Sequence, residues 1–229
     1  WLMTGHINQD IFSYDIKRFQ KFHSDLAFIK IFKEHTIDLE ISEFLEVYKP
    51  INTAYWNKYR NDEVSKSKLR YGRLKDTFDS LNYDITDLEI NKISEVYIES
   101  LADHNYLLPN SKSILDYLFS KYKLHIITNG FEEVQLQKIV SSNIQSYFSK
   151  IITSESVGVK KPNPIIFNEA LKRANALACE SIMIGDNIEA DIYGALESGY
   201  SAILFNYHKI SPPKEITTID NLIELKILL

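Results

Sequence analysis

The strongest chemical signal in the sequence is a pair of aspartates that follows an apolar segment. The run 181–184 leads into Gly185 and Asp186, and Asp191 comes five residues after Asp186. A strand at 181–184 and a helix after Asn187 would let both carboxylates face one point beyond the strand, with Gly185 allowing a tight turn. Clustered carboxylate oxygens suit Mg²⁺. The alternative is that Asp186 and Asn187 only cap the helix.

Two earlier segments offer groups that bind phosphate. The apolar run 124–127 ends at Thr128 and Asn129, which places a hydroxyl and an amide just before an expected helix start. Further along, Lys161 is followed by Pro162, which fixes the backbone beside a cation. Each segment has a simpler explanation, a capped turn in the first case and a solvated surface lysine in the second.

The elements that must position these groups alternate between apolar runs and helical segments. This alternation predicts right-handed βαβ crossovers and an α/β fold, a doubly wound, Rossmann-like parallel sheet covered on both faces. Thr128, Lys161 and Asp186 then all fall at or beyond the carboxyl ends of strands, where open α/β sheets bind ligands. The expected strands are 124–127, 150–153, 181–184 and 201–205.

The region before the sheet has a different period. From about Asp25 to Asp103 the apolar spacing is helical, four helices are the simplest count, and Pro50 predicts a break or kink. Thr86 and Glu89 form a capping box that should start the last helix. We therefore expect an all-helical insertion over 25–106 and a core from 1–24 and 107–229.

Composition limits the classes of partner. With 229 residues, 45% of them hydrophobic, the chain can form one substantial domain and a smaller one. Its net charge of -5 without a basic run argues against a nucleic acid polymer as partner, and no apolar window is long enough for a membrane span. Cys179 is the single cysteine, which argues against a disulfide and fits a cytoplasmic location; we expect it to be a small core residue. The oligomeric state is left open.

The order of the three motifs resembles the haloacid dehalogenase-like superfamily. Thr128, Lys161-Pro162 and Gly185-Asp186 with Asp191 are similar to its second, third and fourth motifs. The resemblance is specific enough to suggest a bacterial subfamily that includes pyrimidine 5'-nucleotidases. The segments that carry this closer likeness are 70–74, 125–133 and 153–158.

The resemblance implies a Mg²⁺-dependent phosphomonoesterase acting on a small phosphate ester, such as a nucleoside 5'-monophosphate. Residues 25–106 would be a helical cap that closes over the site. Thr128, Asn129 and Lys161 would bind the phosphate. Asp186 would bind the metal, with Asp191 as a second, outer-shell carboxylate.

The first motif of the superfamily, Asp-x-Asp-x-Thr, is not found before Asp25. Its first aspartate attacks phosphorus and its second acts as acid and base. The best local match aligns Ser13 with the nucleophile, Asp15 with the acid/base and Lys17 with the threonine. An unactivated serine hydroxyl is far less nucleophilic than a carboxylate, so the nucleophile stays unknown.

This departure keeps a second function open, a catalytically impaired protein that binds phosphate or a nucleotide. A dehalogenase is less favoured, since a phosphate cradle has little purpose there. Four aromatic residues of the helical region could stack on a base, although helical spacing also fits a core position. They are Tyr55, Trp56, Tyr59 and Tyr71.

Overall fold

The computed structural model describes residues 2–4, 17–103, 107–207 and 209–229. The chain divides into two compact units, one formed by residues 1–17 and 106–229 and the other by residues 18–105. The second unit lies close to the range 25–106 expected for the helical insertion. Ser13 and Asp15 lie outside the described residues.

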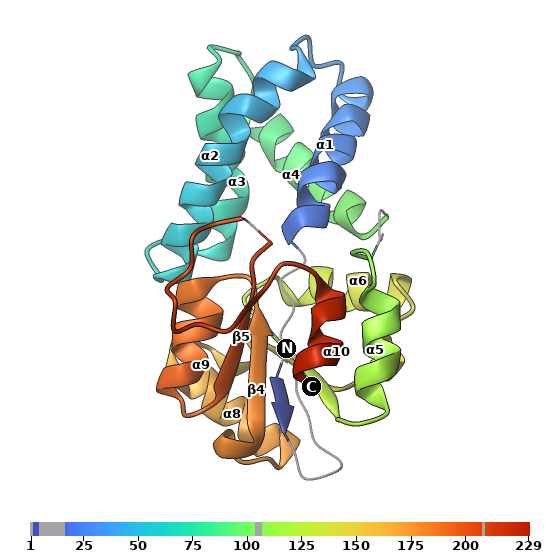
Figure 1. The fold of residues 1–229 in the computed structure, drawn as a ribbon. Helices are drawn as coiled ribbons and strands as arrows, with labels where there is room; N and C mark the ends of the chain where they lie inside the picture. The colour runs from blue at the N-terminus through green and yellow to red at the C-terminus, as the bar shows by residue number, and fades with distance from the viewer. Residues whose placement is uncertain (1, 5–16, 104–106, 208) are drawn as a thin grey trace. The chain divides into compact units, whose positions relative to one another are not determined.

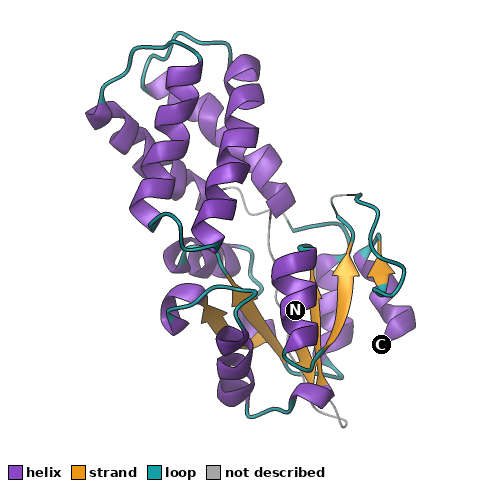
Figure 2. Cartoon of the chain, turned by 90° about the vertical axis from the view of Figure 1, so that its left-hand side faces the viewer, coloured by secondary structure: helices purple, strands orange, loops and turns teal. Residues whose placement is uncertain are grey.

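Four helices form the helical unit (Figures 1 and 2). They are α1 (Lys17–Glu34), α2 (Ile41–Arg60), α3 (Lys66–Ser80) and α4 (Asp87–Asp103). In α4 the predicted capping box is confirmed, because the Glu89 N–H donates to Thr86 Oγ1 and the Thr86 N–H donates to Glu89 Oε2, both at 3.3 Å. The break expected at Pro50 is wrong, since α2 continues through this residue.

The core of the helical unit is aromatic. Phe28 is fully buried and packs edge-on against Phe44 and Tyr48, with ring centroids 4.8 Å away in each case, and it stacks on Tyr97 at 4.7 Å. These contacts join α1, α2 and α4. Aromatic pairs in such geometries stabilise a core beyond their buried area.

A six-stranded sheet forms the centre of the other unit, in the order β3-β2-β1-β4-β5-β6. The strands are β1 (Leu2–Thr4), β2 (Leu124–Thr128), β3 (Phe148–Thr153), β4 (Ser181–Gly185), β5 (Ser201–Phe205) and β6 (Thr218–Ile219). The parallel pairs β2/β3, β4/β5 and β5/β6 confirm the predicted topology.

Strand β1 departs from the expected parallel sheet, because it pairs antiparallel with both β2 and β4. Leu2 pairs with Met183 and Thr4 pairs with Ser181, the first residue of β4. Antiparallel pairing satisfies the backbone groups of neighbouring strands as well as parallel pairing does. As a result, the carboxyl end of β1 lies beside the beginning of β4, whereas Asp186 follows the carboxyl end of β4.

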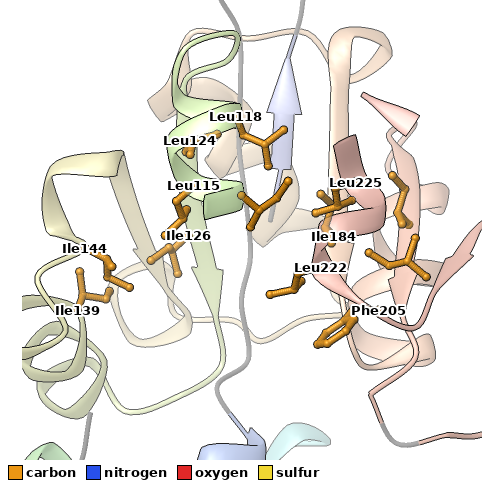
Figure 3. Close-up of a cluster of buried hydrophobic side chains, with 13 residues drawn as sticks. Leu115, Leu118, Leu124, Ile126, Ile139, Ile144, Ile184, Phe205, Leu222 and Leu225 are labelled. Carbon is orange, nitrogen blue, oxygen red and sulfur yellow. The ribbon is translucent and has the colours of Figure 1, made fainter. Parts of the chain in front are cut away.

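Helices cover both faces of this sheet, as expected for a doubly wound fold (Figures 1 and 2). On one face, Leu115 and Leu118 of α5 (Ser111–Phe119) pack with Ile126 of β2, together with side chains of α6 (Glu132–Ser141) and α10 (Leu225–Leu228), as Figure 3 shows. On the other face, Ile127 packs with Phe167 of α8 (Pro164–Ala174) and with α9 (Gly194–Glu197). The adjacent residues Ile126 and Ile127 of β2 thus pack into hydrophobic clusters on opposite faces of the sheet.

Three smaller expectations can be compared with this fold. Cys179 is exposed rather than a core residue, because it falls in a short surface turn before β4. Tyr55 and Tyr59 are buried, in agreement with core positions, whereas Trp56 is half-buried and packs edge-on against Tyr59. Across the described ranges, no helix has the length and apolar character to cross a membrane.

Candidate active site

The end of β2 presents Thr128. This strand is buried along its whole length, and the Thr128 side chain is only 1% exposed. Its Oγ1 accepts a hydrogen bond from the Gly130 N–H at 3.0 Å, which turns the chain tightly before α6 begins at Glu132. A hydroxyl that accepts one bond can still donate its own proton. The strand therefore offers a hydroxyl donor at its carboxyl end.

The end of β4 presents two aspartates. Asp186 follows the strand and is 7% exposed. Asn187 caps the next turn, a π-helical segment η3 (Ile188–Tyr193), because its Oδ1 accepts from the Ala190 N–H at 2.7 Å. Its own N–H donates to Asp191 Oδ2 at 3.1 Å. This turn directs the Asp191 carboxylate back toward the end of β4.

Gly185 is required by close packing. A Cβ built on this residue would lie 2.4 Å from the Asp191 Cβ, a distance that real side chains do not tolerate. The backbone of Gly185 is not in the left-handed region, so its role differs from the expected tight turn. Gly185 is therefore the residue type that lets Asp191 approach the strand.

Lys161 links the two strand ends. It follows α7 (Ser154–Val157), forms a cis peptide with Pro162, and is 2% exposed. Its Nζ donates to the Ile127 carbonyl at 2.8 Å and to Asp191 Oδ1 at 2.6 Å. A buried ammonium needs such an ion pair with additional hydrogen bonds. The three predicted motifs therefore meet at this one side chain.

Asn129 holds the same loop from a second direction. Its Nδ2 donates to the Lys161 carbonyl at 2.9 Å, and its Oδ1 accepts from the Lys161 N–H at 2.8 Å. The side-chain amide of Asn129 therefore makes the two hydrogen bonds that a neighbouring backbone amide would make with Lys161. The sequence predicts Asn129 as a phosphate ligand but gives no sign of its contact with Lys161, because no local pattern links residues 32 positions apart.

The residues present could hold a divalent metal through Asp186. Within the described ranges, no group of three or more His, Cys, Asp or Glu side chains is arranged to bind a metal ion. Asp191 uses Oδ1 with Lys161 and Oδ2 with Asn187, so its role as a metal ligand stays a prediction. Mg²⁺ often binds through one or two carboxylates, with waters and phosphate oxygens completing an octahedron. Asp186 fits this arrangement.

Comparison with known proteins shows which family this chain belongs to. The family model described as haloacid dehalogenase-like hydrolase matches residues 37–205. The chain is 31% identical to the pyrimidine 5'-nucleotidase YjjG of Escherichia coli over 212 residues, which are 91% of this chain and 92% of that protein. The chain belongs to the haloacid dehalogenase-like hydrolase family.

Two further proteins are similar to this haloacid dehalogenase-like hydrolase. It is 26% identical to the pyrimidine 5'-nucleotidase PynA of Streptococcus pneumoniae, over 81% of this chain and 78% of that protein. The crystal structure of the HAD-hydrolase YfnB from Bacillus subtilis, which is bound to magnesium, has a TM-score of 0.85. It covers 96% of this chain and 97% of that one at 22% identity, which supports the fold alone. The predicted resemblance to this superfamily is confirmed.

Proposed function

We propose that this hydrolase is a Mg²⁺-dependent phosphomonoesterase whose substrate is a nucleoside 5'-monophosphate. The observation that carries the proposal is the position of Lys161, whose ammonium contacts Asp191 and the carbonyl that precedes Thr128. One buried cation thus connects its own loop with the end of β2 and with the segment after β4. The pyrimidine 5'-nucleotidases among its relatives favour a nucleotide over other small phosphate esters.

In this proposal the chain acts mainly by position and charge. The Thr128 hydroxyl donates to a phosphate oxygen, and Lys161 neutralises charge that builds up on the phosphoryl group. Asn129 keeps Lys161 in place through the two backbone hydrogen bonds. Phosphoryl transfer obtains most of its catalysis from such positioning and electrostatic stabilisation in a dry site.

Asp186 would supply the carboxylate that holds Mg²⁺. Held by Asp186, Mg²⁺ would supply positive charge that offsets the negative charge of the substrate phosphate. Asp191 would act from outside the metal's coordination sphere, by holding Lys161 in its observed position. We further propose that residues 18–105 form the cap that contacts the nucleoside.

Asp15 is the acid/base in this proposal, with Ser13 at the position of the nucleophile. Its carboxylic acid form would give its proton to the leaving oxygen, and the carboxylate that remains would later accept a proton from water. Replacing Asp15 with Asn should therefore reduce turnover more than it reduces phosphate binding. Equal turnover by Asp15→Asn and the original chain would remove Asp15 from the mechanism.

A second function, phosphate or nucleotide binding without turnover, is favoured by two observations. The sequence has no Asp-x-Asp before Asp25. Strand β1 ends at Thr4, beside Ser181, so its carboxyl end points away from Asp186. In this alternative the site retains Thr128 and Lys161 but lacks the attacking carboxylate.

Phosphate release from nucleoside 5'-monophosphates and sugar phosphates, measured with Mg²⁺, separates the two functions. The test variant is Asp186→Asn, which removes one charge at nearly constant shape. The matched control is Glu189→Gln, because Glu189 is an exposed carboxylate in the same segment. An enzyme should lose most of its release with Asp186→Asn and keep it with Glu189→Gln.

Release by the original chain that does not exceed that of Asp186→Asn would refute the phosphatase. The binding function would then predict that phosphate or a nucleotide with Mg²⁺ raises the melting temperature of the chain, since a ligand bound only by the folded state stabilises it. No change in melting temperature with any of these ligands would refute the binding function as well.

A further inference from the structure

Helix α3 carries three cations on one face. Lys66, Arg70 and Arg73 are spaced four and three residues apart, which places them in one stripe along a helix. The stripe begins at the first helical residue and continues for two turns. All three residues lie in the helical unit, and none of them is among the residues assigned a role at Thr128, Lys161 and Asp186.

The start of this stripe borders a hollow between α3 and α4 with a volume of about 470 Å³. All of the residues that line it have polar or charged side chains, and they include two cations, Lys66 and Arg70, and one carboxylate, Glu95. Hydroxyl groups of Ser65, Ser67 and Ser94 also line it. A hollow with this composition suits an anion that accepts several hydrogen bonds.

Arg73 continues the stripe into the interior of the helical unit. Its side chain is 2% exposed, Nη1 donates to Asn52 Oδ1 at 2.9 Å, and the guanidinium lies 4.9 Å from the centre of the Tyr97 ring. Within the described part of the chain, Nε and Nη2 have no hydrogen-bond partner. A buried guanidinium without a carboxylate is costly, so this position is unexpected for a purely structural residue.

The hollow and Arg73 are adjacent along the same pair of helices. Ser94, which lines the hollow, donates its Oγ–H to the Arg70 carbonyl at 3.5 Å. Tyr97, which lies under the Arg73 guanidinium, follows Ser94 by one turn of α4. The cationic stripe therefore runs from the hollow toward unpaired N–H donors.

We propose that the helical unit binds an anionic small molecule at this stripe, through a phosphate or carboxylate group held by Arg70 and Lys66 and directed toward Arg73. Guanidinium groups bind both kinds of oxyanion with paired hydrogen bonds, so the two share one chemistry. The site goes beyond the proposed function and does not depend on phosphatase activity. The stripe and the site at Lys161 are formed by different residues, so each can be tested by itself.

The test uses the full chain and follows backbone amide resonances by NMR. Sodium phosphate or sodium citrate is added at an ionic strength held constant with sodium chloride, so that general screening does not change. We expect saturable shifts in the amides of residues 65–71 and 91–95. Arg70→Gln should weaken this binding roughly 10-fold or more, as expected for a charged hydrogen bond. Lys68→Gln is the control, because Lys68 is exposed on the same helix and does not line the hollow.

Several results would overturn the proposal. Shifts confined to residues around Thr128, Lys161 and Asp186 would show that only the other site binds these anions. Equal affinity of the original chain and Arg70→Gln, or equal weakening by Lys68→Gln, would show that no specific site exists at the stripe. A preference for phosphate or for citrate identifies which oxyanion the site takes.

The role of Arg73 is tested with Arg73→Met, which keeps an unbranched apolar stem and removes the charge. Removing an unpaired buried charge should leave the melting temperature in sodium chloride unchanged or higher. The rise in melting temperature caused by phosphate or citrate should be smaller than in the original chain. A lower melting temperature in sodium chloride, with an unchanged rise on adding the anion, would show that Arg73 is structural.

Discussion

Replacing Asp191 with Ala should be strongly destabilising, because the buried Lys161 side chain would lose its carboxylate partner. Both side chains are 2% exposed, and their charged atoms lie 2.6 Å apart. The Ile127 carbonyl at 2.8 Å would still accept one hydrogen bond from Nζ. A neutral acceptor offsets only part of the cost of burying an ammonium.

The expected loss in the free energy of unfolding is about 3–5 kcal/mol, the usual cost of removing one partner from a buried ion pair. Lys161→Met should also be destabilising, since it leaves the Asp191 carboxylate buried with only the Asn187 N–H as a described donor. The double variant leaves neither charge buried without its partner. Its loss should therefore be smaller than the sum of the two single losses by about 2 kcal/mol or more.

Urea unfolding followed by circular dichroism measures these differences, with Glu189→Ala as the matched control. Glu189 is exposed in the same segment, so its replacement should change stability by less than about 0.5 kcal/mol. A loss below about 1 kcal/mol for Asp191→Ala, or strict additivity in the double variant, would refute the idea that this ion pair holds the three segments together.

Three further outcomes follow from other contacts. Asn129→Ala should cost about 1–3 kcal/mol, from two lost hydrogen bonds to the Lys161 backbone, and a melting temperature equal to that of the original chain would contradict this. Gly72→Ala should lower the melting temperature despite the better helix propensity of Ala, because the new Cβ would lie 2.5 Å from the Tyr55 hydroxyl; combination with Tyr55→Ala should reduce the effect. Burial and the hydrogen bond to Asp76 raise the pKa of Tyr55 to about 12, so the stability that this group contributes is present below pH 10 and is lost as the pH rises toward 12. The difference in stability between the original chain and Tyr55→Phe should accordingly disappear over that range, and a difference independent of pH would exclude this linkage.

Much of the fold was predictable because its signals are local. Apolar runs ending in polar turns identified strands β2 to β5, and the spacing of Thr86 and Glu89 located the start of α4. The two-residue strand β6 has too few residues to give a periodic signal. Strand β1 was also missed, because a segment of three residues is too short to show an alternating pattern.

The candidate site also has features that local patterns predict and features that they do not. The sequence by itself determined which residues are candidates for the site, since Thr128, Lys161 and Asp186 each follow a recognisable local pattern. Only the tertiary structure decided how they are used: Asp191 pairs with Lys161, and Asn129 holds the Lys161 backbone. These contacts join residues 30 and 32 positions apart. Their geometry depends on the packing of parallel strands and on the close approach that Gly185 allows, which no local pattern of residues specifies.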